Sequence, residues 1–133
     1  MSKGEEKIIS LLQRSPYSFV REKTFEDFRN GKYRFDFFLP QINTCIEVDG
    51  VQHFQIVPHF HKTRQDFLQA QERDRRKNSF CLARKITLIR IPYWEIDKLN
   101  SYLDMFNSKF LVKNRYHNDY IKVPKEYTSS FKK

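Results

Sequence analysis

Two short stretches within YRFDFFLPQINTCIEVDGVQHF place acidic residues between apolar ones, and this alternation limits the folds open to the chain. It predicts β-strands over residues 33–39 and 44–49, because successive side chains of a strand point to opposite faces of a sheet. The PQIN sequence between them favours a reversal of the chain, which would pair the two strands as a hairpin. With matched faces, the hairpin would gather Asp36, Glu47 and Asp49 on one surface.

Three neighbouring carboxylates among apolar side chains repel one another and lose hydration, so their pKa values should rise. A divalent cation removes that penalty, because carboxylate oxygens are the ligands that Mg²⁺ prefers. The pattern therefore predicts a site at which Asp36, Glu47 and Asp49 bind Mg²⁺ or Mn²⁺. Gln52 and His53 follow a glycine that turns the chain, so they can fold back over this site, where His53 could accept or donate a proton. The alternative is a solvated strand face with scattered acids, which the apolar neighbours of each acid disfavour.

The segments around the hairpin complete an α/β pattern. Apolar periodicity and capping residues predict helices over 2–14, 63–84 and 95–106, and strands over 19–25 and 86–94. This order of elements predicts an α/β domain with a mixed central β-sheet flanked by helices. The strand after the long helix should pair parallel to the strand containing Glu47, through a right-handed crossover. We expect this core to cover residues 1–108, followed by a basic, aromatic-containing C-terminal extension over 109–133.

Two further acids lie on the apolar faces of the predicted helices. Asp74 lies in the middle of the stripe of the long helix that should pack on the sheet. The neighbouring arginines in ERDRRK leave a structural Asp–Arg pair as the alternative to a role in the site. Glu5 shares a face with Ile8 and Leu12, but its spacing from Ser2 is also that of a capping box.

The 25 Lys and Arg residues exceed the 16 Asp and Glu residues, which gives a net charge of +9. Such an excess favours binding of nucleic acid through counterion release, with solubility alone as the alternative. The basic residues expected to hold phosphates flank Asp74 or lie in the aromatic-rich tail: Arg73, Arg75, Arg76, Lys113 and Arg115. The expected partner is double-stranded DNA, and an RNA target stays open because phosphate contacts do not identify the sugar.

Other features exclude several classes of protein. No apolar run approaches the roughly 18 residues that a membrane span needs, and the start, MSKGEEK, lacks the apolar core of a signal peptide. Cys45 and Cys81 form neither a disulfide framework nor a metal-finger spacing, which fits a reducing interior. We therefore expect an intracellular protein without a membrane partner, in the cytoplasm or associated with the nucleoid or host-cell DNA.

Two smaller motifs have both a functional and a structural interpretation. His59 and His61 form the one candidate pair for zinc, but a lone pair in a basic loop more often faces solvent or phosphate. Tyr93 and Trp94 could stack on an unpaired base, and closing the core at the end of a buried strand is the favoured alternative.

Together these motifs resemble the PD-(D/E)XK nuclease superfamily, in particular its very-short-patch mismatch repair endonucleases and the related EDxHD homing endonucleases. The resemblance covers residues 2–96. SKGEEKI is similar to the opening helix of that branch, with its glutamate, and YRFDFFLP is similar to its first metal-ligand strand. IEVDGVQHF resembles the following strand and its turn ending in histidine, and QERDRRKNSFCLARKITLIRIPYWEI resembles the later helix and strand. The resemblance implies a restriction-endonuclease-like core, with catalytic roles for the matching residues Glu5, Asp36, Glu47, Asp49, His53 and Asp74.

Two departures from this family affect the predicted mechanism. Asp49 stands where the usual motif of the superfamily has lysine, so another group must meet the charge of the transition state. His53, Lys77 or a second cation could do so. The zinc site of the mismatch-repair branch needs several Cys and His residues that are absent here, which argues against direct mismatch repair.

The sequence thus predicts a Mg²⁺-dependent DNA endonuclease that hydrolyses phosphodiester bonds, of a homing or nicking type. In this hypothesis Asp36 is the central metal ligand, and Glu47 and Asp49 are further ligands or position water. His53 is the general acid or base, and Asp74 orients His53 or completes an outer shell. The alternatives are a structure-selective nuclease, such as a junction resolvase, and a catalytically silent DNA-binding module. Sequence specificity would come from loops, from the tail or from the formation of a homodimer.

Overall fold

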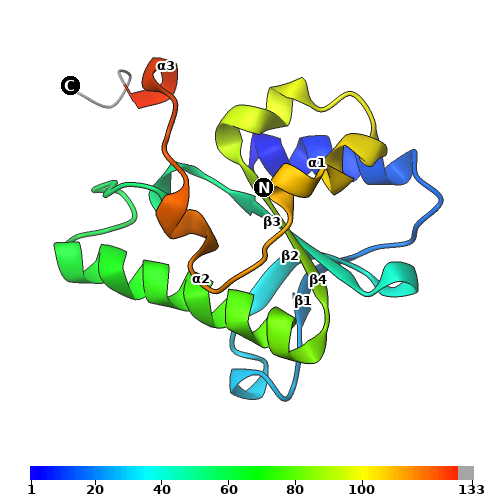
Figure 1. The fold of residues 1–133 in the computed structure, drawn as a ribbon, viewed down its shortest axis with the longest axis horizontal. Coiled ribbons are helices and arrows are strands. Elements are labelled where there is room, and N and C mark those ends of the chain that lie inside the picture. Colours follow the sequence, from blue (N-terminus) through cyan, green and yellow to red (C-terminus); the bar gives the residue numbers. More distant parts are fainter. Residues whose placement is uncertain (129–133) are drawn as a thin grey trace.

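The computed structural model describes residues 1–128 of the chain. Its helices and strands are α1 (Lys3–Gln13), β1 (Val20–Thr24), β2 (Arg34–Leu39), β3 (Thr44–Asp49), α2 (Arg64–Arg84), β4 (Thr87–Pro92) and α3 (Lys125–Thr128). The four strands form one sheet, which lies between α1 on one face and α2 on the other (Figure 1). None of the helices within residues 1–128 is long and apolar enough to cross a membrane.

The sheet is mixed, with the strand order β1-β2-β3-β4. β2 pairs antiparallel with both β1 and β3, whereas β3 and β4 are parallel. Helix α2 connects the two parallel strands, because a parallel pair needs a long crossover. The predicted α/β architecture, with a mixed sheet and helices packed against it, is therefore confirmed.

Side chains of β3 alternate between two hydrophobic clusters. Ile46 packs in the cluster that contains Ile8 of α1, whereas Cys45 packs in the cluster that contains Cys81 of α2. The acidic residues of β3 have the same parity as Cys45, so they point to the α2 side of the sheet. This alternation places the acids of β3 opposite the long helix.

Strict alternation is interrupted in β2 at Asp36. Phe37 and Phe35 are both fully buried, but Phe37 packs on the α1 side and Phe35 on the α2 side. The paired positions of β2 and β3 end at Phe37 and Ile46. The regular ladder between the two strands therefore ends next to Asp36.

Helix α2 matches the predicted range of 63–84. The side chain of Thr63 accepts a hydrogen bond from the backbone of Asp66, and the Asp66 side chain accepts one from the backbone of Thr63. This capping box satisfies backbone donors of the first turn. The helix ends at Arg84, because the left-handed backbone of the next residue, Lys85 (φ 57°), cannot continue it.

The helix predicted over 95–106 is wrong. The chain there forms two 3₁₀ segments, Tyr93–Lys98 and Tyr102–Phe106. Leu99 is extended between them, and the capping box of Ser101 and Asp104 starts the second segment. Apolar spacing compatible with a helix was present, but the cap at Ser101 divides it.

The segment after residue 108 contributes to the folded domain. Leu111 forms an isolated antiparallel bridge with Ile89 of β4, and the backbone N–H of Val112 donates to the carbonyl of Leu88 (3.0 Å). Phe110 packs in the α1-side cluster and Val112 in the α2-side cluster. The extension predicted over 109–133 is thus joined to both cores, and its last five residues, 129–133, lie outside the described residues.

Candidate active site

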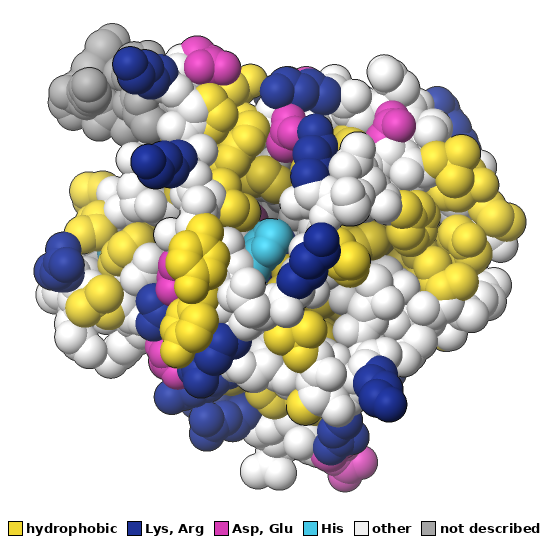
Figure 2. All heavy atoms as spheres, viewed as in Figure 1, with side chains coloured by type: hydrophobic (Ala, Val, Ile, Leu, Met, Phe, Trp, Pro, Cys, Tyr) yellow, Lys and Arg dark blue, Asp and Glu magenta, His cyan; other side chains and the backbone are white. Residues whose placement is uncertain are grey.

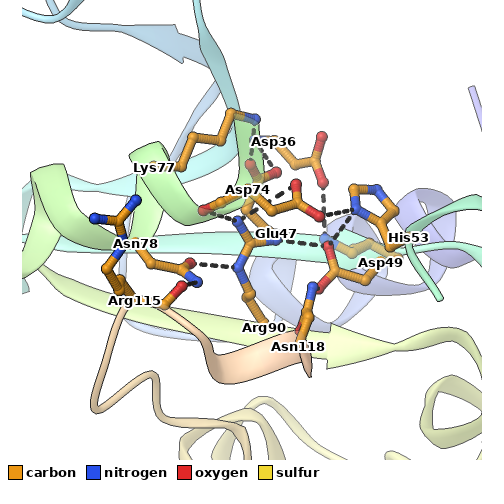
Figure 3. Close-up of polar contacts among 11 residues, drawn as sticks. Asp36, Glu47, Asp49, His53, Asp74, Lys77, Asn78, Arg90, Arg115 and Asn118 are labelled. Atoms are coloured by element: carbon orange, nitrogen blue, oxygen red, sulfur yellow. Dashed lines mark hydrogen bonds and ion pairs between the residues drawn. The ribbon is translucent and has the colours of Figure 1, made fainter. Parts of the chain in front are cut away.

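Asp36 and Glu47 meet where the ladder between β2 and β3 ends (Figure 3). The backbone N–H of Asp36 donates to Oε2 of Glu47 (3.2 Å), and the backbone N–H of Val48 donates to Oδ2 of Asp36 (2.7 Å). Side chains therefore take the place of backbone partners, and they hold two acids in contact.

The environment of this pair disfavours two negative charges. Burial and the charge of Glu47 together raise the pKa of Asp36 to about 9. For Glu47, burial acts to raise the pKa, but the charges of Lys77 and Arg90 outweigh it and lower the pKa. At neutral pH the pair therefore holds a proton on Asp36 unless a cation replaces it.

Lys77 approaches the pair from α2. Its Nζ lies 2.5 Å from Oε1 of Glu47, and its side chain is only 14% exposed. The sequence suggested Lys77 as one candidate to replace the lysine missing at position 49. The Lys77 ammonium contacts the carboxylate of Glu47, so a cation is present beside the pair. This cation comes from α2 and not from β3, the strand that contains position 49.

Asp49 lies on the same side of the sheet as this pair, but it binds other residues, although the sequence predicted it as a third metal ligand. Its Oδ1 lies 2.8 Å from Nη1 of Arg90, and its Oδ2 accepts a hydrogen bond from the Asn118 side chain (3.1 Å). Asp49 and Arg90 are each about 1% exposed. Within residues 1–128, no three or more His, Cys, Asp and Glu side chains are arranged to hold a metal ion. The three-carboxylate ligand set is therefore not assembled, because Arg90 and Asn118 bind one of its members.

His53 contacts Asp74, as the sequence suggested. Its Nδ1 lies 2.8 Å from Oδ2 of Asp74 and 3.6 Å from Oδ1 of Asp49. Burial acts to lower the pKa of His53, but the charge of Asp49 and the hydrogen bond and charge of Asp74 raise it to about 9. For Asp74, burial opposes ionisation, but Arg90 and His53 lower the pKa. Oδ1 of Asp74 also lies 3.7 Å from Arg90. An Asp–Arg pair is thus present, but its arginine comes from β4 and not from the neighbouring ERDRRK segment.

A cavity of about 400 Å³ opens next to His53 and Asp74. Gln52 and Lys77 line it, as does Arg73 from the exposed side of α2. The ionisable residues of its lining are two acids, two imidazoles and two cations: Asp66, Asp74, His53, His61, Arg73 and Lys77. With His53 protonated, the net charge of this lining is positive, which suits an anionic ligand.

Glu5 lies at the start of α1 and has local partners. Its backbone N–H donates to Oγ of Ser2, whose hydroxyl donates to Oε1 of Glu5 (3.1 Å each). Its Oε2 lies 3.6 Å from Arg21. The capping role that the spacing indicated is therefore present, and no described contact joins Glu5 to Asp36 or Glu47.

The five basic residues predicted to bind phosphates differ in their surroundings. Arg75 pairs with Asp119 (3.0 Å) and Glu72 (3.4 Å), and Arg115 also pairs with Glu72 (3.4 Å). Arg76 donates to the hydroxyl of Tyr33, Lys113 is exposed, and Arg73 lines the cavity beside His53. Of the five, Arg73 is the residue brought to the His53 cavity.

The smaller motifs have structural roles. His61 is buried and its Nδ1 accepts a hydrogen bond from the backbone of Val57 (3.0 Å), so it helps to fix its own loop. Trp94 is 8% exposed and packs against Phe54, with ring centroids 4.9 Å apart. It closes the core at the end of β4, as the favoured alternative had it.

Sequence reasoning missed Arg90 and Asn118. Arg90 also donates to the side chain of Asn78 (2.7 Å), so it links β3, β4 and α2 (Figure 3). A signal was present, because an arginine between the isoleucines of ITLIRIPYW must be buried with a counterion. Asn118 gave no signal, since an asparagine in a polar segment has many possible partners.

Comparison with known proteins identifies viral relatives of part of the chain. It is 36% identical over 67 residues to "Uncharacterized protein 307L" of Invertebrate iridescent virus 6, which covers 49% of this chain and 34% of that protein. It is 41% identical over 59 residues to "Uncharacterized protein 094L" of Frog virus 3 (isolate Goorha), covering 44% of this chain and 38% of that protein. The chain thus spans about a third of the length of the curated relatives it matches. No family model matches the chain, and no solved structure matches it.

Proposed function

We propose that the protein is a Mg²⁺-dependent endonuclease that hydrolyses phosphodiester bonds of double-stranded DNA, on a restriction-endonuclease-like core. The observation that carries the proposal is the partly buried contact between Asp36 and Glu47, with Lys77 and the His53–Asp74 pair next to it. Acids in such contact are unfavourable for folding alone. They therefore point to a ligand that needs both.

The pair fits a magnesium ion held by two carboxylates. Mg²⁺ usually keeps several waters and takes one or two carboxylates from the protein, so the absence of Asp49 from the ligand set is compatible with binding. Asp36 and Glu47 would hold the ion, and the proton on Asp36 would leave when it binds. The ion would polarise a phosphoryl oxygen and lower the pKa of a bound water.

Lys77 supplies positive charge that this chain lacks at position 49. Its ammonium forms an ion pair with Glu47. Lys77 also lines the same cavity as His53. A phosphate entering the cavity would meet this cation. In a site of low exposure, such a charge stabilises the additional negative charge of the transition state.

His53 is suited to donate a proton. Asp74 binds its Nδ1, which leaves Nε2 for the substrate, and the raised pKa keeps the ring protonated at neutral pH. We therefore assign His53 as the general acid that protonates the leaving oxygen, with Asp74 as the group that orients it. This assignment selects one of the two roles that the sequence left open.

The test is nicking of supercoiled plasmid DNA with Mg²⁺, with Mn²⁺ and with EDTA. The unmodified chain should nick with either metal ion and not with EDTA. Asp36→Asn should lower the rate by at least about a hundredfold, and His53→Gln by about a hundredfold, as expected for loss of a proton donor.

Matched controls are Asp27→Asn and His59→Gln, which make the same chemical changes at exposed positions. Both controls should nick at the unmodified rate. Undiminished cleavage by Asp36→Asn would remove the assignment of the site. DNA binding without cleavage by the unmodified chain would instead support the catalytically silent module.

A further inference from the structure

A shallow depression of about 450 Å³ lies between α2 and the turn that joins β1 to β2. Its lining includes Phe28, Arg29, Glu72, Arg76, Phe80 and Arg115. The rings of Phe28 and Phe80 stack, with centroids 4.3 Å apart and planes at 11°, and they are part of the α2-side core. The depression therefore combines a rigid aromatic wall with a basic rim.

The positive charge of this region is only partly compensated. Glu72 is the one acid that lines the depression, and its carboxylate lies 3.4 Å from Arg115 and 3.7 Å from Arg76. Across the part of the chain that the structure describes, Arg29 and Arg73 form no ion pair. Figure 2 shows basic side chains gathered on and below α2. Such an excess attracts an anion.

Tyr33 adds a neutral donor to this basic rim. Nη1 of Arg76 donates to the Tyr33 hydroxyl (3.1 Å), so the hydroxyl hydrogen is available for another acceptor. That hydrogen bond and the charges of Arg76, Arg29 and Arg73 lower the pKa of Tyr33. Arg29 has a left-handed backbone (φ 51°), a conformation that is uncommon outside glycine and is often found at binding sites.

The depression lies next to the candidate active site along α2, since Arg76 lines the depression and the following residue, Lys77, lines the cavity beside His53. Tyr33 precedes Asp36 by three residues of extended chain, about 10 Å. Arg73 lies between the two regions, because it lines the cavity beside His53 and also acts on Tyr33. One DNA strand can therefore contact both regions at once, within a few nucleotides of each other.

We propose that Arg29, Tyr33 and Arg76 form a phosphate-binding subsite for the backbone of the cleaved DNA strand, within a few nucleotides of the scissile bond. The choice of DNA as ligand rests on the proposed function, and the geometry of the subsite does not. The two arginines provide charge, and the tyrosine provides a directed hydrogen bond. The subsite would fix the register of the strand against Asp36 without contacting a base.

The test is equilibrium binding of a fluorescent DNA duplex, followed by anisotropy over a series of salt concentrations with EDTA present to prevent cleavage. Arg29→Gln and Arg76→Gln should each weaken binding several-fold and lower the slope of log K against log salt by about 0.9. Tyr33→Phe should weaken binding with an unchanged slope, because it removes no charge. Arg34→Gln is the matched control, since it removes an exposed charge from the neighbouring residue of the chain, and it should leave both quantities unchanged.

An unchanged slope in both arginine variants, an equal change in Arg34→Gln, or no duplex binding by the unmodified chain would overturn the subsite. Thermal denaturation of each variant checks that it is folded. The nicking assay separates this result from the proposed function. If the arginine variants bind with the salt dependence of the unmodified chain while Asp36-dependent nicking is intact, the subsite is wrong and the proposed function stands. If the arginine variants show the expected change in salt dependence but the unmodified chain does not nick DNA, the nuclease function is wrong and the phosphate-binding site stands.

Discussion

At the scale of single residues, the candidate site contains ionisable side chains whose burial lowers the stability of the folded state. Asp36 shows this most clearly, because burial and Glu47 raise its pKa from the ordinary 3.8 to about 9. A folded state that binds a proton more tightly than the unfolded state loses stability as pH rises through that interval. The acid thus lowers stability between about pH 4 and pH 9 and favours cation binding there.

Replacing Asp36 should therefore stabilise the protein. Asp36→Asn keeps both hydrogen-bonding directions of the protonated acid, so it should raise the free energy of unfolding by about 2–4 kcal/mol at pH 8 and by much less at pH 5. Urea denaturation at the two pH values measures this difference. Mg²⁺ should stabilise the unmodified chain and not the variant. Asp27→Asn, with neither effect, is the control, and a destabilised Asp36→Asn would contradict the prediction.

The raised pKa of His53 depends on its acidic neighbours. Asp74→Asn should lower the pKa of His53 from about 9 towards 6.5, because it removes a charge and weakens the hydrogen bond at Nδ1. Titration of the imidazole resonances by NMR measures the shift. The stability that His53 contributes is complete below pH 6.5 and is lost as pH rises through 9. Asp27→Asn should leave the titration of His53 unchanged, and the same pKa in Asp74→Asn would show that Asp74 does not act on the ring.

At the scale of elements, the segment His117–Tyr120 connects the C-terminal part of the chain to the site. The Asn118 side chain donates to Asp49, and Asp119 pairs with Arg75 of α2. Asn78 of α2 donates to the backbone carbonyl of Arg115 (2.9 Å). The segment therefore bridges α2 and β3 on the side of the sheet that carries the acids.

Asn118→Ala tests this bridge. One oxygen of buried Asp49 would lose its donor, so the free energy of unfolding should fall by about 2 kcal/mol. Chemical denaturation measures the loss. Asn100→Ala makes the same change at an exposed position and should alter stability by less than about 0.5 kcal/mol. Equal effects of the two substitutions would show that the hydrogen bond to Asp49 contributes nothing specific.

At the scale of the whole molecule, one sheet supports two cores, and the C-terminal part of the chain is needed by both. Phe110 is 3% exposed in the α1-side core and Val112 is 4% exposed in the α2-side core. The boundary predicted at residue 108 precedes both residues. The reason is that a polar, basic segment gives little periodic signal, whereas two apolar side chains suffice to fix it on the sheet edge.

A chain that ends at residue 108 should therefore fail to fold cooperatively. Removing a buried phenylalanine alone costs about 3–5 kcal/mol, and the total stability of a small domain is only about 5–15 kcal/mol. Urea denaturation followed by circular dichroism should show a broad or absent transition for residues 1–108. The full chain should show a single sharp transition, and a sharp transition of the shorter chain at the same urea concentration would contradict the assignment.

The sequence by itself determined the types and order of the strands, the long helix and the placement of acids on one side of the sheet. These follow from local regularities: the period of two in β3, the capping box at Thr63 and the position of Asp74 on the helix. The proximity of Asp36 to Glu47 and of His53 to Asp74 was also predicted, because a hairpin and a tight turn limit where such residues can lie.

Only the tertiary structure decided the partners of each acid. Parity places Asp49 on the same side as Glu47, but the register of β3 against β4 brings Arg90 to it, and the C-terminal segment brings Asn118. Likewise, Lys77 reaches Glu47 because of the position at which α2 packs across the face of the sheet. Local patterns fix the direction in which a side chain points, whereas ion pairs between distant segments depend on packing that no local pattern contains.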